Sequence, residues 1–319
     1  MFKQCKTLLT LLLLSSLMPL LAQSDDSGNT GFDTLKLVYN AKTMSMGGAV
    51  IGLAENAGSL TFNPAAILRA PNSTLAATVM NHFVGSGGGS IDYVYPKDIF
   101  MAYGASLRYW NSGSMDRTEI SPSGELIETG DTFGSQSLIA SASMARYISS
   151  AIDLGGSLKF IFDSVDDANA TAVMVDVGVL HHTVNEKVKV GLSVRNIGFQ
   201  SSYYTENKYK EGLPMTFGVG LSMQMREDLV AAMDVGKAGG EKVMARFGLE
   251  YYLYPSLALR AGFKSNAADY HMGSFMGYLG GGSLGLGWKT GKFGLDYAIA
   301  SYGDLGLINQ ITVNYNFNK

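Results

Sequence analysis

The chain has 319 residues, of which 46% are hydrophobic and only 16% are charged, which is low for an ordinary globular domain. Its formal net charge of −3 excludes a generally basic nucleic-acid-binding protein. The 39 glycines, 17 tyrosines and 15 phenylalanines, against only 7 prolines, are typical of a β-rich chain with little water-facing surface.

The first 22 residues read as a signal peptide. Lys3 and Lys6 precede an apolar run that ends at Ala22, and this run is too short and too interrupted for a good membrane-spanning helix. We expect cleavage to leave Gln23 as the new N-terminus. The single cysteine, Cys5, would be removed with the signal peptide, so the mature chain would carry no disulfide and no thiol chemistry.

Residues 23–72 are predicted to form a short polar leader followed by a compact, irregular plug or hatch. From Phe32 to Ala70 the sequence mixes helix formers, glycines and one proline without clear alternation. Because this stretch precedes the first strand, we expect it to begin in the periplasm. It folds either inside the barrel, where its glycines would allow close backbone packing, or as a periplasmic cap.

Residues 73–319 are predicted to form the barrel itself, because alternating segments recur there almost without a break. Most segments have the length that crosses a bilayer at the tilt of a barrel strand. The predicted strands, about 14 in number, lie near residues 74–83, 89–95, 99–110, 135–146, 151–163, 170–182, 187–197, 214–225, 228–236, 242–252, 256–264, 281–289, 292–301 and 309–317.

Charged residues within these segments fall on one face only. In the stretch from Val188 to Ile197, for example, the aliphatic residues occupy one face, and Lys189 and Arg195 occupy the other. A charge that faces lipid at the bilayer centre costs about 2–4 kcal/mol, so the charged face should point into the lumen. The predicted lumen-facing charges are Asp176, Arg195, Arg246, Glu250 and Arg260.

Connection lengths separate a membrane barrel from a soluble β-sandwich, which shows a similar apolar/polar alternation. Connections after even-numbered strands are short, whereas those after odd-numbered strands are longer and more variable, as at 111–134, 198–213 and 265–280. Outer-membrane barrels have short periplasmic turns and long external loops. We therefore predict a transmembrane antiparallel β-barrel in the outer membrane of a Gram-negative bacterium, with a soluble all-β fold as the alternative.

Residues 41–67, AKTMSMGGAVIGLAENAGSLTFNPAAI, resemble the N-terminal signature of the FadL-like outer-membrane proteins, and especially of the PorV/PorQ family. Further stretches resemble the same pattern, namely GLSVRNIG with Leu213-Pro214, GLEYYLYPSLALRAGF, GLDYAIASYGDLG and the final ITVNYNF. The chain departs from the pattern in ending Phe317-Asn318-Lys319 rather than on an aromatic residue. The motif residues of the predicted plug are Met46, Gly47, Gly48, Asn63, Pro64 and Ala65.

The resemblance implies a 14-stranded barrel and two functions. Some members of the family help a type IX secretion system to pass cargo across the outer membrane or deliver it to surface attachment. The leading prediction is accordingly a non-enzymatic protein whose partners are outer-membrane lipid, secretion-machine proteins and secreted cargo. The alternative is a FadL-like channel for the uptake of hydrophobic small molecules. A continuous apolar pocket beside the plug would favour uptake, and a filled lumen with a large exposed loop surface would favour secretion.

No catalytic or cofactor-binding constellation stands out, and an outer-membrane lipid hydrolase is a third, poorly supported class. His181 and His182 are adjacent in a strand, so they point to opposite faces and make a poor metal pair; the other histidines are His82 and His271. Gly280–Gly285 fits a dinucleotide-binding motif only formally, because no βαβ unit surrounds it.

Two loops carry weaker signals. The stretch Asp163–Asn169 is either a Ca²⁺-binding loop or a solvated loop. Three tyrosines of a later connection are either contacts for a partner or membrane-interface residues, namely Tyr203, Tyr204 and Tyr209. The inward charges are expected to pair across the lumen rather than to select a substrate.

Overall fold

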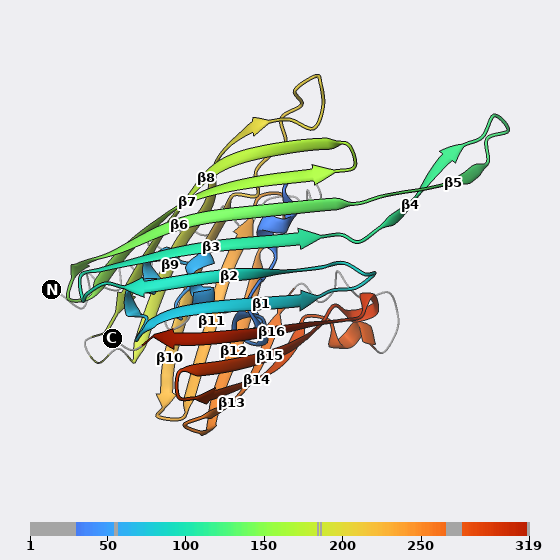
Figure 1. Cartoon of the computed structure of the whole chain (residues 1–319). Helices are drawn as coiled ribbons and strands as arrows, with labels where there is room; N and C mark the ends of the chain where they lie inside the picture. The colour runs from blue at the N-terminus through green and yellow to red at the C-terminus, as the bar shows by residue number, and fades with distance from the viewer. Residues whose placement is uncertain (1–29, 54–56, 184, 186, 266–275, 318–319) are drawn as a thin grey trace.

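The protein is a closed antiparallel β-barrel of fourteen strands, in which β1 pairs with β16 to close the ring (Figure 1). The computed structural model describes residues 30–53, 57–183, 185, 187–265 and 276–317. The predicted signal peptide (1–22), the leader up to residue 29, residues 54–56 of the 41–67 signature and His271 lie outside the described residues.

The predicted fold class is confirmed, and each predicted range overlaps one barrel strand. The strands are β1 (Ser73–Asn81), β2 (Gly87–Pro96), β3 (Met101–Asn111), β6 (Ser135–Ser149), β7 (Ile152–Val165), β8 (Ala168–His182), β9 (Val188–Ser202), β10 (Thr216–Arg226), β11 (Leu229–Ala238), β12 (Met244–Tyr254), β13 (Leu257–Lys264), β14 (Gly282–Thr290), β15 (Phe293–Ser301) and β16 (Leu307–Phe317). Closure leaves no open sheet edge, which a strand surrounded by lipid requires.

The two ends of the barrel differ in their connections. At the short-turn end the strands are joined by residues 97–100, 150–151, 183–187, 227–228, 255–256 and 291–292. At the opposite, long-loop end the connections include 112–134, 203–215 and 265–281. One connection was predicted too long: β7 and β8 both extend beyond their predicted limits and meet in a two-residue turn at Asp166 and Asp167. In outer-membrane barrels the short turns face the periplasm.

A two-stranded hairpin, which the sequence did not predict, occupies the longest connection of the long-loop end. It consists of β4 (Met115–Ile120) and β5 (Leu126–Phe133), and it projects well beyond the barrel rim (Figure 1). Arg117 donates two hydrogen bonds to Asp166 in the β7–β8 turn, at 2.6 and 2.7 Å. This contact ties the base of the hairpin to the barrel.

The outer and inner faces of the barrel have opposite chemistry, as predicted. Along β12, Phe247 and Leu249 are 44% and 50% exposed, whereas Glu250 between Leu249 and Tyr251 is fully buried inside. The same alternation places Leu259 outward and Arg260 inward on β13. An exposed apolar belt of this size would promote aggregation in water, whereas in a bilayer it contacts the hydrocarbon chains of the lipid. In the described part of the chain, no helix has the length and apolar character needed to cross a membrane.

Strand β9 contains a β-bulge at Arg195 and Asn196, both of which face inward. Asn196 adopts a left-handed φ of 60°, its backbone N–H donates to Asp176 Oδ1 at 2.7 Å, and Lys159 donates to its side-chain oxygen at 2.7 Å. The extra residue shifts the inward face to the alternate positions and lets the strand continue to Ser202. This explains why the strand runs five residues beyond its predicted end at 197.

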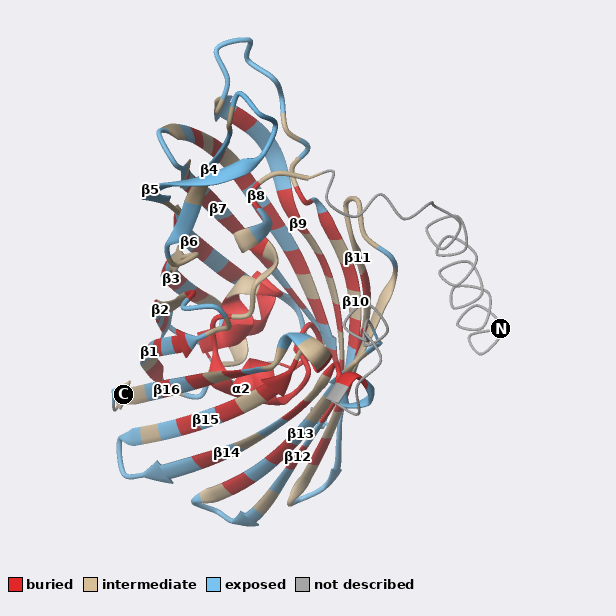
Figure 2. Ribbon diagram, turned by 90° about the vertical axis from the view of Figure 1, so that its right-hand side faces the viewer, coloured by how far each residue is buried: buried red, intermediate tan, exposed pale blue. Residues whose placement is uncertain are grey.

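The N-terminal segment, described over residues 30–53 and 57–70, lies within the barrel and is largely buried (Figure 2). It contains four short helical elements, η2 (Asp33–Lys36), α2 (Ala41–Ser45), η3 (Ala57–Thr61) and η4 (Pro64–Arg69). Contrary to prediction, the described part begins at the long-loop end, where Gly31 donates a backbone hydrogen bond to Gly212 at 3.0 Å. It then crosses the lumen to reach β1 at the short-turn end.

Candidate functional site

The candidate site is the contact surface between the N-terminal segment and the inner barrel wall. Near the long-loop end this contact is apolar. Phe32 and Leu35 are buried against inward-facing Ile139, Ile161 and Met174. Burial of this kind stabilises the start of the segment by removing apolar surface from water.

Helix α2 is short, and a side-chain cap and the barrel wall hold it in place. Asn40 is the N-cap residue, and its side chain accepts a hydrogen bond from the Thr43 backbone N–H at 3.1 Å. The backbone N–H of Ala41, in the first turn of the helix, donates a hydrogen bond to Thr312 on β16 at 2.9 Å. The Thr312 hydroxyl is in turn hydrogen-bonded to Thr78 on β1 at 2.8 Å. The helix is thus fastened at the seam where the barrel closes.

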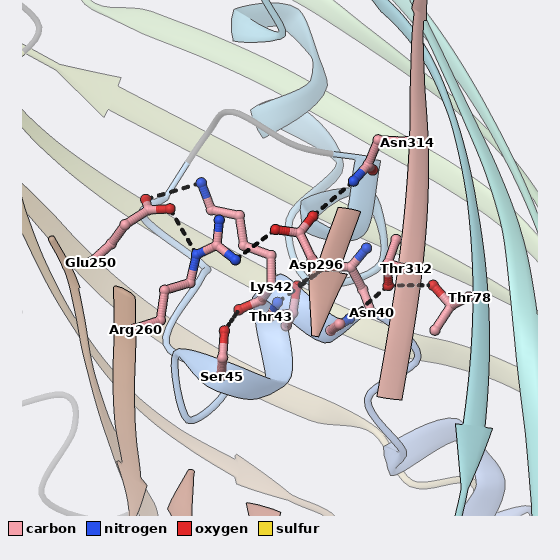
Figure 3. A network of polar contacts seen from close by, with 11 residues as sticks. Asn40, Lys42, Thr43, Ser45, Thr78, Glu250, Arg260, Asp296, Thr312 and Asn314 are labelled. Atoms are coloured by element: carbon pink, nitrogen blue, oxygen red, sulfur yellow. Dashed lines mark hydrogen bonds and ion pairs between the residues drawn. The ribbon is translucent and has the colours of Figure 1, made fainter. Parts of the chain in front are cut away.

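A chain of buried charges continues from α2 along the wall, and Figure 3 shows it from close by. Lys42 lies 3.0 Å from one carboxylate oxygen of Glu250, and the other oxygen accepts a hydrogen bond from Arg260 at 2.8 Å. Arg260 also contacts Asp296 at 2.6 Å, and Asp296 accepts from Asn314 at 2.7 Å. The two cations and two carboxylates balance, as buried charges require.

Met46, Gly47 and Gly48, the first predicted plug motif, form a tight turn against β12 and β13. Met46 is fully buried, and the two glycines have left-handed φ values of 64° and 81°. A Cβ on Gly47 would lie 2.6 Å from the backbone nitrogen of Phe263. Only glycine meets both the conformational and the steric demand here.

The carboxylate of Asp234 on β11 binds the backbone of the next part of the segment. Its Oδ2 accepts hydrogen bonds from the backbone N–H groups of Val50 and Ile51, at 2.8 and 2.9 Å. The sequence analysis did not single out Asp234, although its place in the AAMDVG stretch marks it as another inward-facing charge.

The second predicted plug motif, Asn63-Pro64-Ala65, begins η4. Asn63 caps the helix by accepting from the Ala65 N–H at 3.1 Å, and it donates to the carbonyls of Ile51 and Val179 at 2.8 and 3.1 Å. Pro64 occupies the first turn, where its missing N–H costs nothing.

Glycines of the barrel wall make room for this motif. A Cβ on Gly155 would lie 2.3 Å from the Ala65 nitrogen, and one on Gly178 would lie 2.0 Å from the Asn63 side-chain oxygen. Gly285, within the glycine-rich stretch 280–285, packs in the same way against Ser45. These glycines allow the segment to pack closely against the barrel wall.

Arg69 ends η4 and meets two wall residues that the sequence analysis did not bring together. Its guanidinium contacts Asp153 on β7 at 2.5 and 2.7 Å, and it lies 2.7 Å from Nε2 of His182 on β8. His181 and His182 point to opposite faces, as predicted, and it is His182 that faces inward. No spacing rule in the sequence links these three residues, because they come from three separate elements.

The remaining predicted lumen charges contact neighbouring strands or the segment. Asp176 pairs with Lys159 at 2.8 Å. Arg195 donates to the Thr61 carbonyl at 3.2 Å and lies over the ring of Phe62 at 4.8 Å. Arg246 lies opposite Asp234 in the β11–β12 register. These charges were predicted to pair across the lumen, and in the structure their contacts run along the wall and to the segment.

Residues of the predicted Ca²⁺ loop have other contacts. Asp163 faces inward and accepts hydrogen bonds from Ser137 and Tyr204, and Asp166 pairs with Arg117. Among the described residues, no group of three or more His, Cys, Asp or Glu side chains is arranged to hold a metal ion. Of the three loop tyrosines, Tyr204 packs on Phe32, with 5.9 Å between ring centroids, and Tyr209 is 67% exposed.

Two cavities open at the short-turn end beside the segment. The larger, about 620 Å³, is lined by residues that include Leu53, Lys187, Lys189, Gln224 and Tyr252. The second, about 440 Å³, is lined by residues that include Lys42, Arg69, Lys189, Arg260 and Asp296. Their walls are mixed or polar, so within the described residues neither forms a continuous apolar chamber.

These features define the class of the protein: a transmembrane β-barrel whose lumen contains its own N-terminal segment. No protein-family profile and no curated protein matches the sequence. Solved structures do match the fold. The P. putida toluene transporter TodX has a TM-score of 0.61 at 13% identity, over 88% of this chain and 99% of that chain.

Two further structures agree. The monoaromatic hydrocarbon channel CymD has a TM-score of 0.60 at 11% identity, over 88% of this chain and 98% of that one. A Pseudomonas aeruginosa FadL homologue has a TM-score of 0.58 at 11% identity, with the same coverages. At such low identity these likenesses establish a FadL-like fold and nothing finer.

Proposed function

We propose that the protein is a non-enzymatic outer-membrane channel for small hydrophobic molecules, in which the N-terminal segment is the plug. The observation that carries this proposal is the FadL-like barrel with the segment seated on its inner wall. The structural neighbours TodX and CymD are described as a toluene transporter and a monoaromatic hydrocarbon channel. This reading was the alternative in the sequence analysis, and the fold comparison favours it over a role in secretion.

The way in which the segment is held fits a removable plug. Its C-terminal end leads into β1, and hydrogen bonds, ion pairs and close backbone contacts hold the described residues before it on the wall. Contacts of this kind can be broken and remade without disturbing the strands, because the barrel closes through its own β1–β16 pairing. Displacement of part of the segment would connect the long-loop end with the cavities at the short-turn end.

Deletion of residues 41–66 tests this proposal. We expect the shortened barrel to insert into planar bilayers, since the strands carry the lipid-facing surface, and to show a higher single-channel conductance than the intact protein. Uptake of toluene and of a long-chain fatty acid by proteoliposomes would then identify the class of solute. A shortened barrel that inserts and conducts no better than the intact one would contradict the plug. The periplasmic-cap reading would not replace it, because the described segment lies in the lumen.

A second candidate function is a role with type IX secretion cargo, as the sequence resemblance suggested. Two observations favour it. The first is the β4–β5 hairpin, which stands beyond the barrel rim and exposes Ile120 and Leu126 at 75% and 74%. The mixed and polar walls of the cavities also suit a filled lumen better than a hydrocarbon path. Cross-linked co-purification from outer membranes, with and without residues 116–131, tests this role. Secretion-machine proteins recovered only with the intact hairpin would favour it over the channel.

A further inference from the structure

Arg69, Asp153 and His182 form a small buried cluster where the N-terminal segment leaves the lumen at the short-turn end. Asp153 is 0% exposed and His182 is 4% exposed. Arg69 Nη2 lies 2.7 Å from His182 Nε2 and 2.7 Å from Asp153 Oδ1. The cluster joins the last residue of η4 to two adjacent strands.

The geometry fixes the protonation state of His182 while Arg69 is docked. A guanidinium group has only hydrogen-bond donors, so the imidazole nitrogen that it approaches must accept. Nε2 therefore carries a lone pair, and the proton of the neutral ring is on Nδ1. His182 Nδ1 is buried without a hydrogen-bond partner.

The surroundings make a second positive charge unfavourable. Arg69 faces His182 from the segment, Asp153 faces it from β7 at 3.6 Å, and Lys189 on β9 lies opposite it in the strand register. His181 points to the other face of β8. Protonated His182 would turn an N–H toward the Arg69 guanidinium and place two cations in direct contact beside one carboxylate, in a setting with little water to screen them.

We propose that His182 is a proton-controlled latch: the neutral ring holds Arg69 and the end of η4 on the barrel wall, and the protonated ring releases them. Proton uptake by His182 and docking of Arg69 then oppose each other, as linked equilibria must. The latch responds to pH on the short-turn side, which is the periplasmic side of outer-membrane barrels. Its effect on conductance rests on the plug function proposed above, whereas the release of η4 does not.

Hydrogen exchange of residues 57–69 in the full-length protein in lipid vesicles measures the release directly. Between pH 7.5 and pH 5, the range over which an ordinary imidazole takes up a proton, we expect protection in this stretch to fall by about tenfold, after correction for the intrinsic pH dependence of exchange. Residues 75–79 of β1, held by backbone hydrogen bonds to β2 and β16, serve as the internal reference.

Three variants isolate His182. His182→Gln offers an oxygen that accepts from Arg69 and cannot take up a proton, so protection should be the same at both pH values. His182→Lys, with a permanent charge, should be released already at pH 7.5. His181→Gln, the neighbouring residue on the outward face, should behave as the intact protein. If His182→Lys does not fold, the Gln variant and the intact protein still decide the question.

The outcomes separate the latch from the channel. Acid release that persists in His182→Gln, or no acid release in the intact protein, overturns the latch. Acid release without a rise in single-channel conductance supports the latch and contradicts the plug, provided that the barrel lacking residues 41–66 also fails to conduct. If that shortened barrel conducts and the intact protein at pH 5 does not, the plug stands and the latch does not control it.

Discussion

The two halves of the N-terminal segment are held on the barrel wall by different physical means. The half around α2 is anchored by charge, through Lys42, Glu250 and Arg260 (Figure 3). The half around η4 is anchored mainly by shape, through wall glycines such as Gly155 and the capping residue Asn63, and by charge only at its last residue, Arg69. A charged anchor tolerates small displacements but depends on ionisation. A close backbone contact is indifferent to pH but tolerates no added atom.

Loss of the central carboxylate should have the largest effect. Glu250→Ala leaves Lys42 and Arg260 buried with one partner fewer, and we expect a loss of about 3–5 kcal/mol in the free energy of unfolding. Denaturant titration in lipid vesicles measures it. Glu128→Ala, at an exposed position of the hairpin, is the control and should change stability by less than about 0.5 kcal/mol. Equal losses in the two variants would show that the charges do not anchor the segment.

Addition of a single methyl group to the barrel wall should displace the half of the segment around η4. In Gly155→Ala the new Cβ would lie 2.3 Å from a backbone nitrogen of the segment, so we expect a loss of about 1–3 kcal/mol and a displaced η4. Gly156→Ala is the matched control, because its Cβ would meet nothing nearer than 3.7 Å. Protease accessibility of η4 reports the displacement. A Gly155→Ala barrel with the protection of the control would refute the steric anchor.

Removal of the cap should have a smaller effect on the same half. Asn63→Ala removes the acceptor for the Ala65 N–H, which costs about 1–2 kcal/mol. Asn63→Ser retains an N-cap oxygen but loses the amide that donates to Ile51 and Val179. Its stability should therefore lie between that of the intact protein and that of the Ala variant. Indistinguishable Ser and Ala variants would assign the whole effect to the donated bonds.

A further expected effect is a pH dependence of stability beside the α2 half. His82 lies in the loop after β1, against the rings of Trp110 and Tyr302. Burial, with a smaller contribution from the charge of Lys264, lowers the pKa of His82 to about 4. The unfolded chain takes up this proton near pH 6.5. Because the unfolded state then binds more protons between about pH 6.5 and 4, stability should fall as the pH decreases through that range.

His82→Phe should abolish this part of the pH dependence, because Phe keeps the aromatic packing and cannot titrate. The measurement is the thermal unfolding midpoint from pH 7.5 to pH 4, in a His182→Gln background so that the two pH effects are measured separately. An unchanged pH profile would mean that His82 does not couple to folding.

The barrel could be predicted from sequence because its rules are local. Alternation along a strand, such as Leu257 to Lys264, identifies both the strand and its faces. At mid-strand the pattern is strict because a charged side chain that faces lipid is strongly destabilising. Prediction failed where tertiary contacts override the local pattern. The bulge at Asn196 depends on Asp176 of another strand, and β4 and β5 have charged residues where a membrane strand would alternate.

The candidate site was predicted only in part, for the same reason. The Met46–Gly48 and Asn63–Ala65 motifs were identified from the resemblance to the FadL-like N-terminal signature, and their glycines and proline also indicate turns. Their partners were not, because Asp234, Asp153 and His182 are distant in sequence and meet the segment only through the curvature of the wall. The direction of the segment through the lumen has no sequence signature at all.

That direction constrains how the protein is made. Gly31 is at the long-loop end and Ser73 starts β1 at the opposite end, so the chain runs the length of the lumen before the first strand begins. A closed ring would have to be threaded, which is topologically difficult. The β1–β16 strand pair, to which Ala41 is hydrogen-bonded through Thr312, would therefore form last, around a segment that is already in place. During biogenesis the barrel strands would close around the N-terminal segment, which would serve as a template for barrel closure.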